Sequence, residues 1–120
     1  MGLLRFSYRS EILSLHTNIT VTLPSEELTY YPLTDIKREE GVARRKWEYR
    51  DGMKFQTVYL LHGGGDDDTC VVRKSNIERY AEENCVMTVT AQANDSFFMD
   101  TQYGYKYFTF LTEELPKVIQ

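Results

Sequence analysis

The chain has 120 residues, 42% of them hydrophobic and 13% aromatic, and its net charge at pH 7 is −4. One domain of this composition can bury a core, which excludes a disordered protein, and its acidic balance argues against binding nucleic acid through phosphates. No apolar run is long enough to span a bilayer, and the N-terminus lacks the pattern of a signal peptide. Cys70 and Cys85 have neither metal-ligand spacing nor the density of a disulfide scaffold. We therefore expect a cytoplasmic protein with reduced thiols that binds neither nucleic acid nor membrane.

The N-terminal segments 3–9 and 12–23 combine β-branched and aromatic residues in partial alternation. This pattern predicts two sequential strands in an antiparallel pairing. In the second segment Thr20 and Thr22 fall on the face opposite the apolar residues, as in a half-exposed strand.

Residues 25–54 differ in composition from the segments before and after them: they are polar, charged and rich in turn formers. We expect an excursion from the sheet here, most simply a surface decoration, inserted into a single domain that spans residues 1–120. Within it, Asp51-Gly52 is a hairpin signal.

The next stretch predicts a strand, a glycine turn, a helix and a second strand. The apolar run FQTVYLL at 55–61 indicates a strand covered on both faces. Ser75 and Glu78 have the spacing of a capping box, so a helix is expected from there to a stop at Asn84. CVMTVTA at 85–91 indicates another buried strand, and together these elements predict a right-handed βαβ unit in a parallel sheet. The helix positions expected to face that sheet are Ile77, Tyr80 and Ala81.

The last third of the chain predicts a loop, QANDSFFMDTQYG, and then a helix. In this helix Pro116 should either produce a kink or begin a fresh turn, because proline cannot donate a backbone hydrogen bond. The residues expected on the buried side of the helix are Tyr107, Phe110, Leu111 and Leu115. A parallel α/β sheet that stops on a helix is unfinished.

The stretch HGGGDDD at 62–68 admits three interpretations. A dinucleotide phosphate loop would need glycine at the position of Asp68, and the three aspartates would repel a phosphate. A metal site on the aspartates lacks the alternating spacing of a calcium loop, and a solvated acidic turn before a helix explains them more simply. In the third, an oxyanion hole, glycines let backbone N–H groups point at the oxygen that becomes negative in ester hydrolysis. His-Gly-Gly-Gly directly after an early sheet strand favours this third interpretation.

Three segments in order, YLLHGG, RKSNIERYAEEN and SFFMDTQYGYKYFTFLTEELP, resemble the N-terminal half of an esterase family of α/β-hydrolases. The family includes tributyrin esterases, S-formylglutathione hydrolases, and feruloyl and acetylxylan esterases, and the resemblance is closest to the tributyrin esterases. It covers residues 55–119 well and 3–23 loosely. It implies an incomplete α/β-hydrolase fold, with N-terminal strands plus one βαβ unit of a mostly parallel sheet. It also implies a serine esterase that hydrolyses short-chain carboxylic esters without a metal or an organic cofactor.

The resemblance also implies roles for individual residues. The expected oxyanion-hole donors are Gly64 and Gly65, supported by His62 and Gly63. The residues expected near the acyl or alcohol pocket are Asp100, Gln102, Tyr103 and Gly104. Cys70 stands where relatives usually have tryptophan.

The nucleophile of such an enzyme is missing from this sequence. The family's serine sits in a G-x-S-x-G elbow, but the only serines beyond residue 25 are Ser75 and Ser96, and neither lies between glycines. We expect the catalytic triad beyond Gln120, so that this chain is the N-terminal portion of an esterase and is inactive alone. The alternative is a non-catalytic carbohydrate-binding or interaction module derived from an esterase, which would use the aromatic residues at 97–110. Because the strand at 55–61 would lack its usual neighbour, we also expect a homo-oligomer through that sheet edge.

Overall fold

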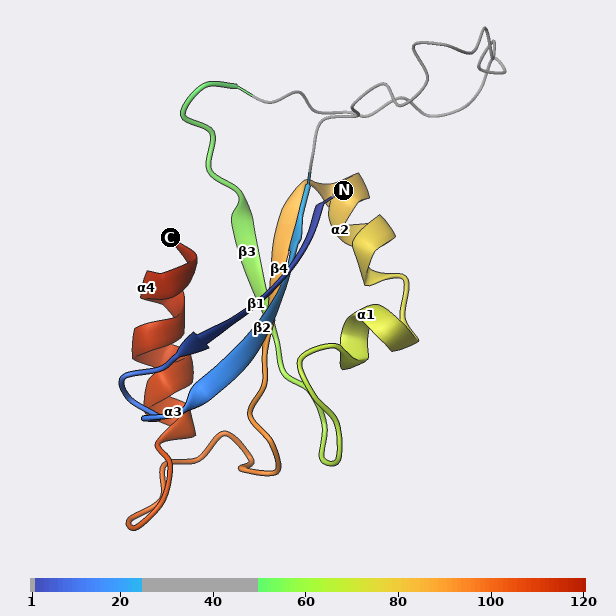
Figure 1. Ribbon diagram of the computed structural model, residues 1–120. Coiled ribbons are helices and arrows are strands. Elements are labelled where there is room, and N and C mark those ends of the chain that lie inside the picture. Colours follow the sequence, from blue (N-terminus) through green and yellow to red (C-terminus); the bar gives the residue numbers. More distant parts are fainter. Residues whose placement is uncertain (1, 25–49) are drawn as a thin grey trace, which may run out of the picture.

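A computed structural model describes residues 2–24 and 50–120, which form a four-stranded sheet with helices on both sides (Figure 1). The strand order is β1-β2-β4-β3, and only the pairing of β3 with β4 is parallel. The sheet is therefore mixed, and the antiparallel pair predicted at its N-terminal end is confirmed. The strands are β1 (Gly2–Arg9), β2 (His16–Leu23), β3 (Gln56–Leu60) and β4 (Val86–Ala91).

Helices occupy the connection from β3 to β4 and the C-terminal segment. No helix in the described ranges is long and apolar enough to cross a membrane. The helices are α1 (Cys70–Lys74), α2 (Ile77–Asn84), α3 (Tyr107–Thr109), a π-helical turn η1 (Phe110–Glu114) and α4 (Leu115–Ile119).

The expected excursion lies outside the described residues up to position 49. Asp51-Gly52 does form a tight turn, which is closed by a 2.9 Å hydrogen bond from the Met53 N–H to the Arg50 carbonyl. The residues that would complete the predicted hairpin on the N-terminal side belong to the undescribed stretch.

The two faces of the central strands bury different kinds of side chain. Because successive side chains of a strand alternate, the apolar residues of β2 and β4 share one face with the C-terminal helix, and the threonines share the other with α2. Thr20 and Thr22 are only 2% and 1% exposed, so the prediction of a half-exposed strand is wrong. β2 has a strand on each side and α2 against its threonine face. The apolar cluster contains Leu13, Ile19, Val21, Val89, Ala91, Ala93, Tyr107, Phe110 and Leu115.

The segment from β3 to β4 forms the predicted βαβ unit. The parallel register runs from Gln56 opposite Val86 to Leu60 opposite Thr90. α2 ends at Asn84 as predicted, and Cys85 closes it in the left-handed region at a φ of 55°.

The start of the helix differs from the prediction. Ser75 is not the N-cap residue of α2: it follows α1, a helix that the sequence did not predict. Its Oγ donates to the carbonyl of Val71 and accepts from the N–H of Ile77, the first residue of α2, at 3.3 Å. Asn76 is the residue before α2, and it makes no side-chain capping bond. Ala81 is buried as expected, but Tyr80 is exposed, because the helix turns only a narrow face to the sheet.

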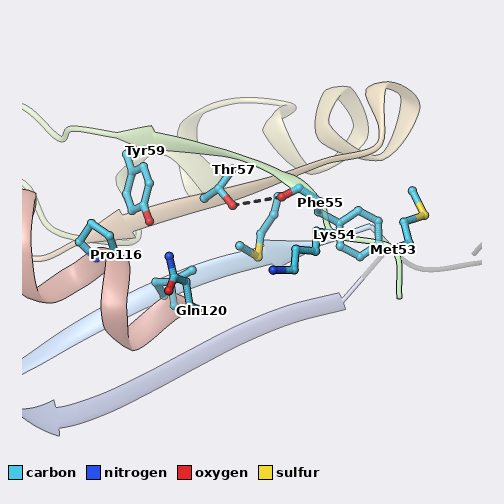
Figure 2. A pocket seen from close by; sticks show the side chains of 9 residues that line it. Met53, Lys54, Phe55, Thr57, Tyr59, Pro116 and Gln120 are labelled. Carbon is cyan, nitrogen blue, oxygen red and sulfur yellow. Dashed lines mark hydrogen bonds between the residues drawn. The ribbon is translucent and has the colours of Figure 1, made fainter. Parts of the chain in front are cut away.

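β3 is the outer strand of the sheet, and no described strand pairs with its far side. The prediction that both its faces are covered is wrong, because Val58, Tyr59 and the following Leu61 are exposed. Its position at the edge is the arrangement expected for a strand without its second neighbour. Thr57 and Tyr59 form, with Pro116 and Gln120 of the C-terminal helix, part of the wall of a groove of about 610 Å³ (Figure 2).

The C-terminal segment is helical, and its predicted buried side is confirmed by Tyr107, Phe110 and Leu115. Pro116 begins a fresh turn, which is one of the two outcomes predicted for it. Just before it, the N–H of Leu115 bonds to the carbonyl of Phe110, five residues back, so η1 widens the helix where proline cannot continue the regular ladder.

Candidate functional site

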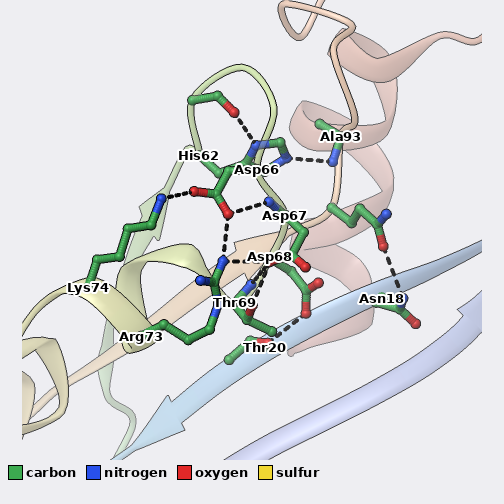
Figure 3. Close-up of polar contacts among 12 residues, drawn as sticks. Asn18, Thr20, His62, Asp66, Asp67, Asp68, Thr69, Arg73, Lys74 and Ala93 are labelled. Atoms are coloured by element: carbon green, nitrogen blue, oxygen red, sulfur yellow. Dashed lines mark hydrogen bonds and ion pairs between the residues drawn. The ribbon is translucent and has the colours of Figure 1, made fainter.

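The glycine turn, residues 62–65, follows the carboxyl end of β3 and meets the loop that follows β4 (Figure 3). β3 and β4 are adjacent and parallel, so their carboxyl ends open on the same edge of the sheet. In open α/β sheets this edge is where ligands bind.

His62 ties these two loops together. Its side chain is buried, with the Nδ1 atom 2.8 Å from the carbonyl oxygen of Gly63 and the Nε2 atom 2.9 Å from the backbone nitrogen of Ala93. A backbone N–H can only donate, so Nε2 accepts from Ala93 and the proton sits on Nδ1, which donates to Gly63. The ring also lies against Phe98, at 5.8 Å between centroids. Because both ring nitrogens are engaged, the geometry supports a structural role for this histidine.

Gly65 is the residue of the turn that requires glycine. Its φ is +72°, in the left-handed region that other residues rarely adopt. Its N–H donates to the Oδ1 atom of Asp95 at 2.6 Å. The same oxygen lies 3.6 Å from the point where a Cβ of residue 64 would stand, which is ordinary contact. The turn thus holds a carboxylate oxygen on a backbone N–H.

The first two aspartates after the turn serve the loop and α1. Asp66 accepts from Arg73 at 2.6 Å and from the ammonium of Lys74. The hydrogen bond from Lys74, with the charges of both cations, lowers the pKa of Asp66. Asp67 accepts from the backbone N–H and the hydroxyl of Thr69, and these two bonds lower the pKa of Asp67. These carboxylates hold the entry to α1.

The third aspartate reaches the sheet. Asp68 is 1% exposed, and its Oδ2 accepts from the hydroxyl of Thr20 at 2.6 Å. The interpretation of the run as a solvated acidic turn is therefore wrong for Asp68, which anchors the loop to the threonine face of β2. Within residues 2–24 and 50–120, no group of three His, Cys, Asp or Glu side chains is placed to hold a metal ion.

The residues expected near the substrate pocket fall into two groups. Asp100 accepts from the backbone N–H and the hydroxyl of Thr109, so it holds the start of the C-terminal helix, and the bond from the hydroxyl is the main cause that lowers the pKa of Asp100. Tyr103 and Gly104 line an open pocket together with the turn that precedes β2. Gln102 is exposed and lies outside the lining of that pocket, as does Asp100.

The structure also shows the surroundings of two other positions that the sequence singled out, Gly104 and Cys70. A Cβ at Gly104 would stand 2.3 Å from the hydroxyl oxygen of the exposed Thr101, so a larger residue there would require the Thr101 side chain to rotate away. Cys70 is buried at the start of α1, and this burial raises the pKa of its thiol. It is a packed side chain at the first position of α1.

Asp95 is the residue that sequence reasoning missed. Its only signal is position: it lies four residues beyond the end of β4, in the loop adjacent to the glycine turn. Loops that follow neighbouring parallel strands meet in space, so a polar side chain there was a candidate on topology alone.

No protein-family model and no curated protein matches the chain. Solved structures do match. The fluorophosphonate-binding serine hydrolase F of Staphylococcus aureus is 24% identical, with a TM-score of 0.72 over 99% of this chain and 40% of that one. A ferulic acid esterase is 19% identical, with a TM-score of 0.68 over 98% of this chain and 42% of that one. An S-formylglutathione hydrolase of Agrobacterium tumefaciens is 19% identical, with a TM-score of 0.69 over 96% of this chain and 42% of that one.

These similarities define the fold. The chain spans about two-fifths of the length of each of these proteins. The mixed four-stranded sheet and its βαβ unit form a partial α/β-hydrolase fold, as predicted, and it matches the N-terminal portion of esterases.

Proposed function

We propose that this chain supplies the oxyanion-binding part of a serine carboxylic-ester hydrolase, with Gly64 and Gly65 as backbone donors and His62 and Gly63 as their support. One observation carries the proposal: the N–H of Gly65 holds an anionic oxygen at 2.6 Å. When a nucleophile attacks an ester, the carbonyl oxygen becomes negative in the same way. A donor fixed near that oxygen lowers the activation free energy by about 3 kcal/mol. The names of the similar structures, a serine hydrolase, an esterase and an S-formylglutathione hydrolase, support the assignment.

The proposed reaction needs a nucleophile that this chain does not carry. In serine esterases the serine oxygen attacks the carbonyl carbon, and the carbonyl oxygen becomes negative until the alcohol leaves. The 120 residues contain no G-x-S-x-G elbow to supply that serine. Because the elbow is absent, we infer that the chain alone is inactive. We also infer that short-chain acyl esters of the tributyrin type are the substrates of the complete enzyme, and that Asp100, Gln102, Tyr103 and Gly104 lie near its acyl or alcohol pocket.

Two assays with p-nitrophenyl acetate and butyrate test this proposal. The purified chain should show no turnover above buffer, and a serine-directed inhibitor should not label it. A chimera in which the chain replaces the matching part of the Staphylococcus aureus hydrolase should hydrolyse both esters. Turnover by the chain alone, with labelling of one of its serines, contradicts the inferred absence of a nucleophile. A chimera that is folded by circular dichroism yet inactive contradicts the proposed role of the turn.

A second candidate function, binding of carbohydrate, is favoured by exposed aromatic rings. Tyr103 is 95% exposed and lines the same pocket as the exposed Tyr105, and flat rings at a surface can stack on sugars. Xylo-oligosaccharides should then shift the NMR signals of both tyrosines. Tyr103→Ala should abolish the shift of the Tyr105 signals. Phe97→Ala, which removes an exposed ring outside the pocket, should not. Absence of any shift argues against this candidate.

We also propose that a second copy of the chain pairs with the edge of β3. The exposed Val58, the 53% exposed Leu61 and the groove of Figure 2 place apolar surface next to the edge of β3 that no described strand pairs with. Light scattering at high concentration should therefore give the mass of a dimer. Val58→Lys should restore the monomer, and Leu4→Lys, at a 48% exposed position on the opposite edge strand β1, should not. A monomer at all concentrations contradicts this proposal.

A further inference from the structure

Two hydrogen bonds in opposite directions join the glycine turn to the loop after β4. The N–H of Ala93 donates to His62 at 2.9 Å, and the N–H of Gly65 donates to Asp95 at 2.6 Å. The first bond is buried and the second is at the surface. The first fixes the base of the loop, and the second closes its outer part over the turn.

The loop that carries Asp95 has an uncommon backbone. Asn94, Phe97 and Phe98 all have left-handed φ values, of 49°, 53° and 54°. Non-glycine residues in this region cost free energy and persist where surrounding contacts hold them. The loop is thus held in a shape that directs one carboxylate at the turn.

The carboxylate of Asp95 and an external anion cannot share the N–H of Gly65. Both would need the same donor, and two negative oxygens at contact distance repel each other. Asp95 is exposed, so its side chain has room to rotate into water. Occupation by Asp95 and occupation by a ligand are therefore alternative states of one site.

We propose that the glycine turn is a binding site for small carboxylates and oxyanions, and that Asp95 occupies it from within the chain. A ligand reaches the N–H of Gly65 only when Asp95 has moved away. If Asp95 occupies the N–H in about nine of ten molecules, only about one tenth of them can accept a free anion, so Asp95 should weaken the binding of that anion about tenfold. The meaning of this competition for catalysis rests on the proposed esterase function, but the anion site itself does not.

The test uses acetate as the probe and the amide signals of Gly64 and Gly65 in NMR spectra at pH 7 and constant ionic strength. In the unaltered chain, acetate should barely move these signals. In Asp95→Ala the signals should shift saturably, with an apparent dissociation constant about tenfold lower. Asp95→Asn keeps an oxygen acceptor without the charge, so its affinity for acetate should lie between the two. The signal of the Ala93 amide reports in each variant whether the loop keeps its fold.

Each outcome decides the proposal. Equal shifts in the unaltered chain and in Asp95→Ala would mean that Asp95 does not compete for the turn. No shift in either variant, with the Ala93 signal unchanged, would mean that the turn binds no anion. If Asp95→Ala loses the Ala93 signal, Asp95→Asn alone must bind acetate more tightly than the unaltered chain, or the proposal fails. An inactive chimera in the ester assay, together with tighter acetate binding in Asp95→Ala, would remove the esterase function and leave the anion site standing.

Discussion

Replacing His62 with alanine removes a side chain that bonds to both loops of the candidate site. The imidazole is 6% exposed, accepts from the N–H of Ala93 and donates to the carbonyl of Gly63. Alanine offers neither an acceptor nor a donor. Both backbone groups lose their partner at the same time.

The expected cost follows from the burial of each partner. Ala93 is buried, so its N–H would be left unsatisfied away from water, at a cost of about 1–3 kcal/mol. Gly63 is exposed and its carbonyl can bond to water, so the second hydrogen bond contributes only about 0.5–1.5 kcal/mol. His62→Ala should therefore lower the free energy of unfolding by about 2–4 kcal/mol, a large share of the 5–15 kcal/mol typical of a domain.

Urea denaturation followed by far-UV circular dichroism measures this difference. His16, the other histidine of the chain, is exposed at the start of β2, so His16→Ala is the matched control and should change the unfolding free energy by less than about 0.5 kcal/mol. His62→Gln retains an oxygen acceptor and should recover part of the loss. Hydrogen exchange at Ala93 should accelerate in His62→Ala and stay slow in His16→Ala.

Unfolding of His62→Ala at the same urea concentration as His16→Ala would contradict the expected cost. A loss of stability without a change in exchange at Ala93 would also contradict it, because the loss would then arise elsewhere. In either case the two bonds would not be what holds the glycine turn against the loop after β4.

Three further predictions concern the core, a tyrosine and the two thiols. Phe110→Ala should cost about 3–5 kcal/mol in the same denaturation assay, because the ring is fully buried, and a loss below about 1 kcal/mol would contradict its place in the core. The hydroxyl of Tyr8 is buried without a hydrogen-bond partner among the described residues, and burial, assisted by the charge of Glu114, raises the pKa of Tyr8 to about 12. Since this folded value exceeds the unfolded value of about 10, the stabilisation is complete below pH 10 and lost as the pH rises toward 12. Tyr8→Phe should flatten that part of a thermal-unfolding profile, and parallel profiles would contradict this. Iodoacetamide should label Cys85 before Cys70, whose thiol is buried with a raised pKa, and peptide mass spectrometry would expose the reverse order.

Local sequence patterns were sufficient for most elements. β1, β4 and the C-terminal helix lie where the sequence patterns predicted them, and α2 ends at Asn84 as expected. β2 begins at His16 and not at residue 12, because residues 11–15 form the turn that joins it to β1. The helix start was misjudged because Ser75 fits a capping box in sequence, whereas in the structure it ends the preceding short helix. A five-residue helix leaves too little periodicity to be seen.

The sequence by itself determined which residues share a face and where the chain turns, because alternation, helical spacing and glycine act between near neighbours. His-Gly-Gly-Gly after a strand located the candidate site on that basis. Only the tertiary structure decided what covers each face: Thr20 is buried under the connection from β3 to β4, and Tyr80 is left exposed. It also brought Asp68 to Thr20, 48 residues away, and Asp95 to Gly65, 30 residues away. Such contacts depend on which strands become neighbours in the sheet, and that is a property of the whole fold that no local pattern contains.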